Sequence, residues 1–468
     1  MLLANYVLCP HKGRFFSNPF PRILAFPVVV VGIVLAGFST LASPALAQTP
    51  RPSLEGNVSA YSSPSAFDLN GRHVVTLPGT GFGKFGSPYL EIGGDAPTHL
   101  GYGAFVLIRG KFDSHQNAWV ATAVFTRDEE NEKLSGVGVV DKVLSRGSET
   151  ILRADGHRMR LTGTTKTEFS KKLATLADVQ PGTPIRFSGN LSPDGSLSLS
   201  EARFFPAVVK KPKGIPVLET YEDHLTAPDY AHGTAGRVKL GLFGGWHKIP
   251  ADPKLQDRVN RVGMLVVPAY QNAMAEDDPL KIHFRFYAVD DKAYRGEICH
   301  SGGLVLIPTQ VIDRLKNDDQ LATLLADGVA FSLQNQWNRT ITSLRVMEGV
   351  IFAGDVVGAF IPGAGLVGII GGGVAENKYF KMLQQQRARV SLALMADAGF
   401  DLHQAPVAWQ LLAPRRPVQN AEKELPKDHY PPISNYILGV LHQEYRTTPE
   451  CPTSTVSVES IRDSSAKK

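Results

Sequence analysis

Histidines are the residues of this chain whose spacing says most about catalysis. Five occur after residue 254: His283, His300, His403, His429 and His442. A helix binds zinc through two imidazoles in an H-x-x-x-H spacing, with a neighbouring Glu as general base. No two of these histidines have that spacing, and none belongs to an H-x-x-E-H sequence. The chain also has no G-x-S-x-G turn and no G-x-x-x-x-G-K-[ST] loop, so its motifs support neither nucleophilic catalysis nor phosphoryl transfer.

The chain contains three cysteines. Cys9 falls in a segment that we expect to be removed, which leaves Cys299 and Cys451. In an oxidising compartment these two could form one disulfide that ties the C-terminal tail to the preceding domain. Two unpaired thiols are the alternative, because sequence spacing gives no distance between the sulfur atoms.

Residues 1–47 have the pattern of a secretory signal peptide. The basic residues of this segment are Lys12, Arg14 and Arg22. An apolar run at 23–42 and the small-residue site Ala45–Ala47 follow, so we expect cleavage before Gln48. An uncleaved membrane anchor is the alternative, because the basic start is long. Cleavage leaves 46 basic and 44 acidic residues, and the formal charge falls from +5 to +2. We therefore expect no nucleic-acid partner.

Two segments of about eighty residues resemble each other within the chain. Four residues of the first segment match four of the second at an offset of 79: Gly103, Gly110, Ala123 and Phe125 match Gly182, Gly189, Ala202 and Phe204. Upstream, HVVTLPGT from His73 matches HRMRLTGT from His157 at an offset of 84. The matches indicate an internal duplication.

Each repeated unit has the alternation of short strands. In the second unit Met159 and Leu161 alternate with arginines, and a turn signal follows at Pro193–Gly195. The pattern predicts two small OB-like β-barrels, at 55–130 and 134–206. Such barrels often bind oligonucleotides or sugars, and a spacer or docking module is the alternative.

The second unit resembles a bacterial domain family of unknown function with an OB-like barrel. The similar pieces are a G-x-G strand at Gly136–Val139 and a closing strand pair. The closing pair is marked by Ile185, Phe187, Gly189 and Gly195. The resemblance covers about Leu134 to Phe205.

The C-terminal part has a different pattern. Residues 207–253 are predicted to be a linker, and 416–468 an extended or disordered tail. Between them, 254–415 alternates helical and strand patterns. His283–Asp291 is typical of a strand, and Leu321–Gln336 has the apolar spacing of a helix.

The order of these pieces resembles the zinc metallopeptidase family of the CAAX prenyl protease, HtpX and the BepA-like peptidases. The matching segments are Phe286–Asp290, Gly302–Gly303, Asp319–Ala326, Met395–Asp401 and Ala405–Leu412. The resemblance implies a multi-domain fold. Two small all-β OB-like barrels would be followed by an α+β, mainly helical, zincin-like peptidase domain.

The chain differs from that family at the positions of the zinc ligands and the general base. The resemblance places Asp327 at the first zinc ligand, Gly328 at the general base and Phe331 at the second ligand. Gln384 takes the place of the third ligand and Ala388 that of its supporting Asp. Glycine accepts no proton and phenylalanine binds no zinc, so the resemblance implies no catalytic residues, no metal and no cofactor.

The family's substrate groove would lie beside His300, Gly302, Gly303 and Asp327. The strand after Gly303 would offer an edge to an extended peptide. A rebuilt zinc site that uses His300 and Asp327 is the alternative, and zinc would then be the cofactor.

The segment Gly349–Ala375 is apolar, rich in glycine and carries one charge, Asp355. Its length would suffice to span a bilayer. The glycine content and Pro362 favour a hairpin of two short helices that is buried or touches the membrane. Peripheral membrane contact is therefore an expectation.

Together these features predict an exported, catalytically inactive metallopeptidase-like protein. It would bind a peptide or an envelope protein in the periplasm or outside the cell, in association with the membrane or free of it. One alternative is a divergent, active zinc metalloendopeptidase of the HtpX and BepA-like family. Another is a ligand-binding module that uses the paired OB-like barrels.

Overall fold

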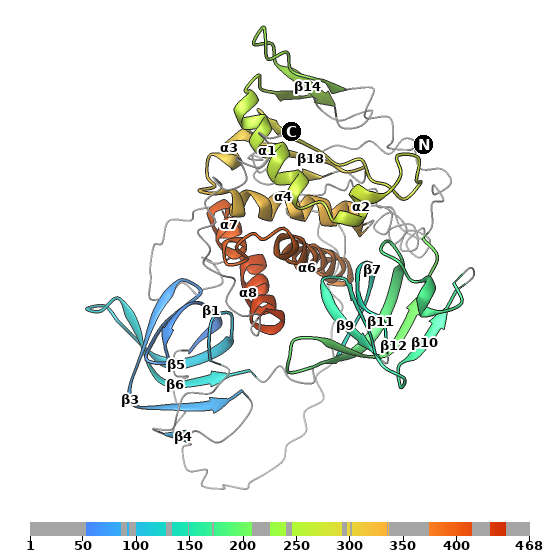
Figure 1. The fold of residues 1–468 in the computed structure, drawn as a ribbon. Coiled ribbons are helices and arrows are strands. Elements are labelled where there is room, and N and C mark those ends of the chain that lie inside the picture. The colour runs from blue at the N-terminus through green and yellow to red at the C-terminus, as the bar shows by residue number, and fades with distance from the viewer. Residues whose placement is uncertain are drawn as a thin grey trace, which may run out of the picture.

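The computed structural model (Figure 1) describes thirteen stretches of the chain. They are 53–85, 91–92, 100–127, 133–147, 149–170, 173–207, 225–239, 246–292, 297–299, 302–334, 336, 374–413 and 431–445. The expected signal peptide, His300, His429 and Cys451 lie outside these residues. So does Gly349–Ala375, apart from its last two residues.

Five strands close the first barrel. They are β1 (Ser53–Ser63), β2 (Ala66–Leu69), β3 (Arg72–Lys84), β5 (Phe105–Asp113) and β6 (Ala118–Thr126). Their pairing runs β1–β2–β3–β6–β5 and returns to β1, with β3 and β6 parallel. The short β4 (Glu91–Ile92) adds to the outer edge of β3. Buried side chains such as Val58, Phe67 and Ile108 fill the interior.

The second barrel repeats this arrangement. Its strands are β7 (Lys133–Ser145), β8 (Thr150–Ala154), β9 (His157–Leu161), β11 (Pro184–Leu191) and β12 (Leu197–Phe204). The pairing runs β7–β8–β9–β12–β11 and returns to β7. The separate β10 (Lys166–Phe169) lies parallel to β12 and corresponds to the second half of β3. A short 3-10 helix, Leu176–Asp178, follows it.

Matching hydrogen bonds show which residues of the two barrels are equivalent. Thr80 Oγ1 donates to the Ala121 carbonyl at 2.9 Å, and Thr165 Oγ1 donates to the Leu199 carbonyl at 2.8 Å. The sequence match is therefore off by one residue in two places, since it aligned Thr80 with Thr164 and Phe125 with Phe204. The strand ladders equate Phe204 with Thr126 rather than with Phe125. Between the equivalent strand pairs, Phe112 with Trp119 and Leu191 with Leu197, the second barrel has five residues where the first has six, and this explains the shift at Phe204.

Two small sheets follow the barrels. One contains β13 (Leu225–Thr226), β14 (Gly236–Lys239) and β15 (Trp246–Ile249), so strands occur inside the segment predicted to be a linker. The other contains β16 (Arg285–Val289), β18 (Leu304–Pro308) and β17 (Ile298–Cys299), in that spatial order. A bridge between Lys248 and Asp290 joins the two sheets.

The described helices are α1 (Pro253–Leu265), α2 (Ala269–Ala273), α3 (Thr309–Ile312), α4 (Asp318–Leu333), α6 (Val374–Asp397), α7 (Gln404–Leu412) and α8 (Pro432–Glu444). Helix α4 is central among them, with α1, α6 and α7 packed on it and α8 packed on α6 and α7. Asn317 caps α4 by accepting the Gln320 amide at 2.9 Å. Residues 320–333 of α4 are all buried, since α1, α6, α7 and β18 surround the helix. None of the helices described is both long and apolar enough to cross a bilayer.

The predicted fold class is wrong in its balance and in its C-terminal part. Strand accounts for 40% of the structure and helix for 29%, and two closed five-stranded barrels occupy 53–204. The C-terminal part is helical but small, instead of the mainly helical zincin-like peptidase domain that we expected. The apolar pattern of 321–336 reflects a helix enclosed on every side, and such a pattern does not report the size of the domain around it.

Helix α8 falls within 416–468, so the prediction of an extended or disordered tail is wrong at 432–444. It lies between the two barrels (Figure 1) and contacts both. His442 Nδ1 is 3.0 Å from the Tyr102 carbonyl oxygen of the first barrel. His157 of the second barrel lies 2.7 Å from a carboxylate oxygen of Glu444. Gly103 is in van der Waals contact with α8, where a Cβ would collide with the Leu438 carbonyl. The helical part thus holds both barrels.

A tight turn of the second barrel docks on α6. Asp155 and Gly156 connect β8 to β9 with φ angles of 59° and 80°, in the left-handed region that hairpin turns use. The Asp155 carboxylate pairs with Arg389 Nη2 at 2.5 Å, and Arg389 Nε donates to the Asp155 carbonyl at 3.0 Å. Arg389 also donates to the Tyr436 hydroxyl of α8. Within the barrel, Gly138 of the G-x-G strand leaves room for this turn, because a Cβ there would lie 2.7 Å from Asp155 Cβ.

Candidate functional site

Four of the five residues that we aligned with a zinc site come together between α4 and α6. Asp327 is 2% exposed, and Gly328, Phe331 and Ala388 are buried near it. The Gln384 side chain is exposed and does not join them. The space is filled by a residue outside that set, Arg387, whose Nε lies 3.2 Å from Asp327 Oδ2. Its guanidinium also lies 5.9 Å from the Phe331 ring centroid.

Glu297 completes this buried ionic cluster, which we define as Glu297, Asp327 and Arg387. It is 1% exposed and precedes β17. Burial, and then the negative charge of Asp327, raise the pKa of the Glu297 carboxyl well above its usual range, while Arg387 opposes the rise. Glu297 and Arg387 gave no signal in the sequence, since neither belongs to a motif and they lie 90 residues apart. One guanidinium faces two carboxyl groups, so the cluster favours the retention of a proton.

The buried ionic cluster predicts a pH effect on stability. Because the pKa of Glu297 is raised on folding, its stabilising contribution is complete below the unfolded-state pKa and is lost as the pH rises through the folded-state pKa. We expect Glu297→Gln to remove this loss, so that the variant gains stability relative to wild type as the pH rises. Urea unfolding at several pH values from 4 to 8 would measure it. Parallel pH profiles for the two proteins would contradict the prediction.

The other predicted groove residues do not form a peptide-binding edge. Gly302 and Gly303 precede β18, and Gly303 has a φ of +87°. However, β18 is the central strand between β16 and β17, and all five of its residues are buried. The expected free edge is therefore absent at β18. The side chain of Cys299 is not described, and among the described residues no three His, Cys, Asp or Glu side chains form a metal-binding group.

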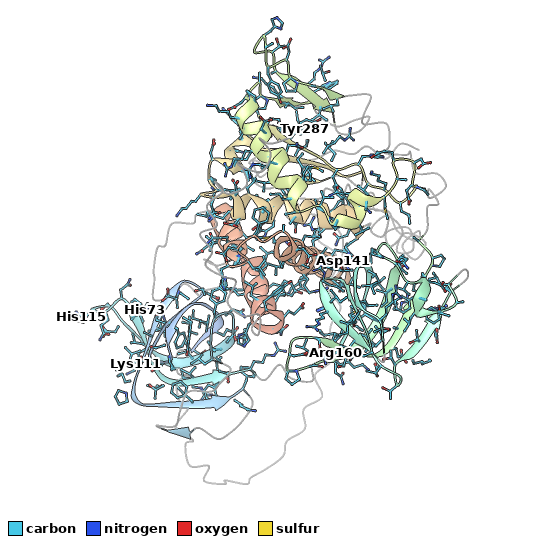
Figure 2. All side chains as sticks on the ribbon, viewed as in Figure 1. His73, Lys111, His115, Asp141, Arg160 and Tyr287 are labelled. Atoms are coloured by element: carbon cyan, nitrogen blue, oxygen red, sulfur yellow. The ribbon has the colours of Figure 1, made fainter. Side chains whose placement is uncertain are left out.

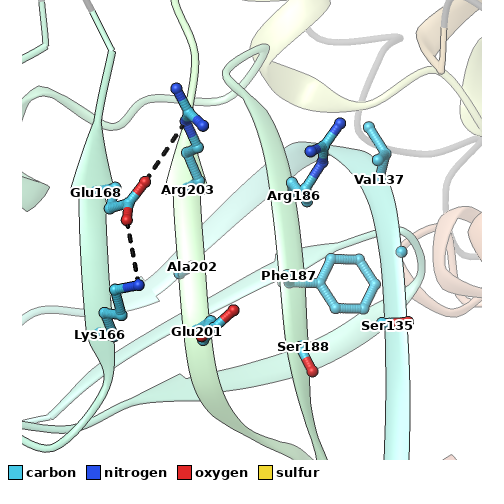
Figure 3. Close-up of a pocket in the computed structure, with 11 residues that line it drawn as sticks. Ser135, Val137, Lys166, Glu168, Arg186, Phe187, Ser188, Glu201, Ala202 and Arg203 are labelled. Carbon is cyan, nitrogen blue, oxygen red and sulfur yellow. Dashed lines mark ion pairs between the residues drawn. The ribbon is translucent and has the colours of Figure 1, made fainter.

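A groove of about 460 Å³ lies instead on the second barrel (Figure 3). Strands β7, β11, β12 and β10 form it side by side. Its charged residues are Lys166, Glu168, Arg186, Glu201 and Arg203. We call this surface the charged groove. Of these residues, the strand alternation in the sequence indicated an outward side chain only for Arg186, and it did not show that the face is hollowed.

Ion pairing within the charged groove is weak and incomplete. Glu168 lies between two cations, 3.4 Å from Lys166 Nζ and 3.7 Å from Arg203 Nε (Figure 3). All three side chains are about half exposed or more, so water screens these pairs. Arg186 and Glu201 are exposed and have no ion pair with any residue that the structure describes. The groove can therefore accept charged groups of either sign.

The charged groove is apolar at its β7 rim, whereas the Phe187 side chain belongs to the barrel core on the opposite face of β11 from Arg186. The Phe187 ring is buried and packs over Gly136, where a Cβ would lie 2.8 Å from the ring. Val137 is exposed at the rim, at 37%. An occupant would thus meet apolar surface at one side of the groove and charges along the remainder.

The first barrel uses the equivalent face for its own packing. The residues at the positions of Glu201 and Arg203 are Ala123 and Phe125, which are 4% and 7% exposed. The Arg109 guanidinium covers the Phe125 ring at 5.2 Å. The two repeats share a fold, but only the second presents this face as an open, charged surface.

The comparisons with known proteins give no family for this chain. No family model matches it, and no curated protein matches it. Its function therefore has to be inferred from the geometry of its own residues.

Proposed function

We propose that this protein is an exported binding protein of the cell envelope, in which the charged groove of the second barrel takes a segment of a peptide or partner protein. The helical part and the first barrel form the frame that presents this groove. The observation that carries the proposal is the divergence of the two repeats. One repeat covers the face with apolar side chains, and the other leaves it open with five charged ones.

The composition of the charged groove supports a protein ligand over a polyanion. Three cations and two carboxylates line it, so phosphates along a nucleic-acid backbone would meet repulsion as well as attraction. A peptide carries both signs of charge together with apolar groups, which suits this mixed surface. The mature chain would also be close to neutral, at +2.

The proposed location outside the cytoplasm rests on the residues at 1–47. A basic start, an apolar run and a small-residue site are the features that an export machinery recognises. Intact mass measurement of the chain recovered from the cell envelope would test it. A mass that begins at Gln48 is expected, and recovery of the full-length chain from the cytoplasm alone would contradict the proposal.

A charge reversal in the groove tests the binding function. Short random peptides displayed on phage would be selected on the mature chain, and their affinity would be measured for Arg186→Glu. Lys111→Glu is the matched control, since it makes the same charge change on the exposed surface of the first barrel (Figure 2). We expect Arg186→Glu to weaken binding about tenfold or more and Lys111→Glu to leave it within about twofold. Selected peptides that bind all three proteins equally would contradict the proposal.

A further inference from the structure

The two repeats differ in how they use one strand edge. In the first barrel β4 adds antiparallel to β3, with Gly81 opposite Ile92. The equivalent of Gly81 in the second barrel is Lys166, in β10. There β12 pairs with one side of β10, and no strand within the described stretches pairs with its other side. The chain therefore contains an internal example of how this edge can be filled.

We propose that the free edge of β10 binds an extended segment of a partner protein, which adds antiparallel as a further strand. This inference rests on the proposed function and specifies how the charged groove is used. Main-chain hydrogen bonds to β10 would provide affinity, and alternate side chains of the segment would lie beside the groove and provide specificity.

The backbone of β10 is oriented for such an addition. The Ser170 N–H donates to the Phe204 carbonyl at 3.0 Å, which fixes the side of β10 that faces β12. Backbone groups of successive strand residues point to opposite edges, so those of Glu168 also face β12 and those of Thr167 face the free edge. The Phe169 ring stacks on Phe204 at 5.7 Å on the core side, which anchors the strand.

The charges of β10 specify the order of charges in the bound segment. The side chains of Lys166 and Glu168 lie on the groove face, and their mutual contact is long and exposed. In an antiparallel partner, the residue opposite Glu168 comes two positions before the residue opposite Lys166. A segment with the order base-x-acid would thus form two favourable cross-strand pairs, whereas acid-x-base would place like charges opposite each other.

Two capped synthetic peptides with the same composition, TVKVEVT and TVEVKVT, test this order. Labelled peptides would be titrated with the mature chain and followed by fluorescence anisotropy. We expect TVKVEVT to bind about tenfold more tightly, since both cross-strand pairs change sign between the two peptides. Equal affinity, or a preference for TVEVKVT, would overturn the antiparallel addition.

A substitution pair at the free edge tests the mode of binding. Thr167→Pro removes the N–H that faces the edge, and proline is tolerated at such positions. Thr167→Val keeps the N–H and serves as the control. We expect Thr167→Pro to weaken TVKVEVT binding about tenfold and Thr167→Val to leave it within about twofold.

The outcomes separate this inference from the proposed function. Binding that is lost in Arg186→Glu but unchanged in Thr167→Pro would overturn strand addition and leave the groove as a binding site. If neither peptide binds, strand addition fails, and the phage selection still decides the proposed function. If Thr167→Pro does not fold, the comparison of the two peptides on the wild-type chain decides the inference alone.

Discussion

Arg389→Met should lower the free energy of unfolding by about 3–5 kcal/mol, because it breaks a buried ion pair from one side. Arg389 joins three parts of the molecule: the Asp155 turn of the second barrel, α6 and Tyr436 of α8. Burial lowers the pKa of the Arg389 guanidinium, but the charge of Asp155 more than offsets this effect and raises the pKa overall. Methionine would keep the apolar stem of the side chain and leave the Asp155 carboxylate buried without its cation.

The measurement is urea unfolding followed by circular dichroism. Arg158→Met is the matched control, since Arg158 is exposed and lies next to the same turn. This control should change the free energy of unfolding by no more than about 0.5 kcal/mol. Adding Asp155→Asn to Arg389→Met should recover part of the loss, because the unpaired charge is removed. Equal losses for Arg389→Met and Arg158→Met would show that the ion pair does not hold the barrel.

Gly156→Ala should have the second large effect, a loss of about 3 kcal/mol, from two causes that add. The φ of Gly156 is +80°, a conformation that disfavours a Cβ by about 1–2 kcal/mol. A Cβ would also lie 2.5 Å from Arg389 Cβ and 2.6 Å from its carbonyl carbon. Because these are atoms of the α6 backbone and its first side-chain carbon, relief requires that the turn withdraw from the helix.

The first barrel supplies a matched control that separates the two causes. Gly71 occupies the equivalent turn with φ +76°, and its nearest atom, Gln410 Nε2, would be 3.9 Å from a Cβ. Gly71→Ala should therefore show only the conformational cost, about 1 kcal/mol. Urea unfolding would measure the loss of unfolding free energy in each variant. The difference between the two losses is the cost of the contact with α6. Equal losses would mean that the Gly156 turn has room to move.

A second pair of glycines reverses the roles of the barrels. Gly103 has φ +79° and contacts α8, whereas its repeat partner Gly182 has φ +95° and nothing within 4 Å of a Cβ. The duplicated unit thus has two left-handed glycine positions, and each barrel uses a different one for its contact with the helices. The sequence match at an offset of 79 pairs Gly103 with Gly182, but the match at 84 misses the pairing of Gly71 with Gly156 by one residue. Neither match shows which member is in contact.

The strands and turns could be predicted from residues that are close together in the sequence. The alternation of Ile185 and Phe187 with Arg186 appears in β11, where the first two are buried and Arg186 is exposed. Such alternation follows from the two-residue period of a strand, so neighbouring residues suffice to reveal it. The helix predicted at 321–336 was also visible in its apolar residues, and the structure places it at 318–333. Its surroundings were not visible, because an enclosed helix has no polar face from which its neighbours could be inferred.

The sequence by itself therefore determined the duplication, the strand alternation and the presence of a helix at about 321–336. Only the tertiary structure decided which copy keeps an open face, since that depends on whether Ala123 or Glu201 occupies the same place on two similar barrels. It also brought Glu297 to Arg387 and Asp155 to Arg389. These contacts join residues that are distant in the chain, and no local period encodes which distant residues will share a buried site.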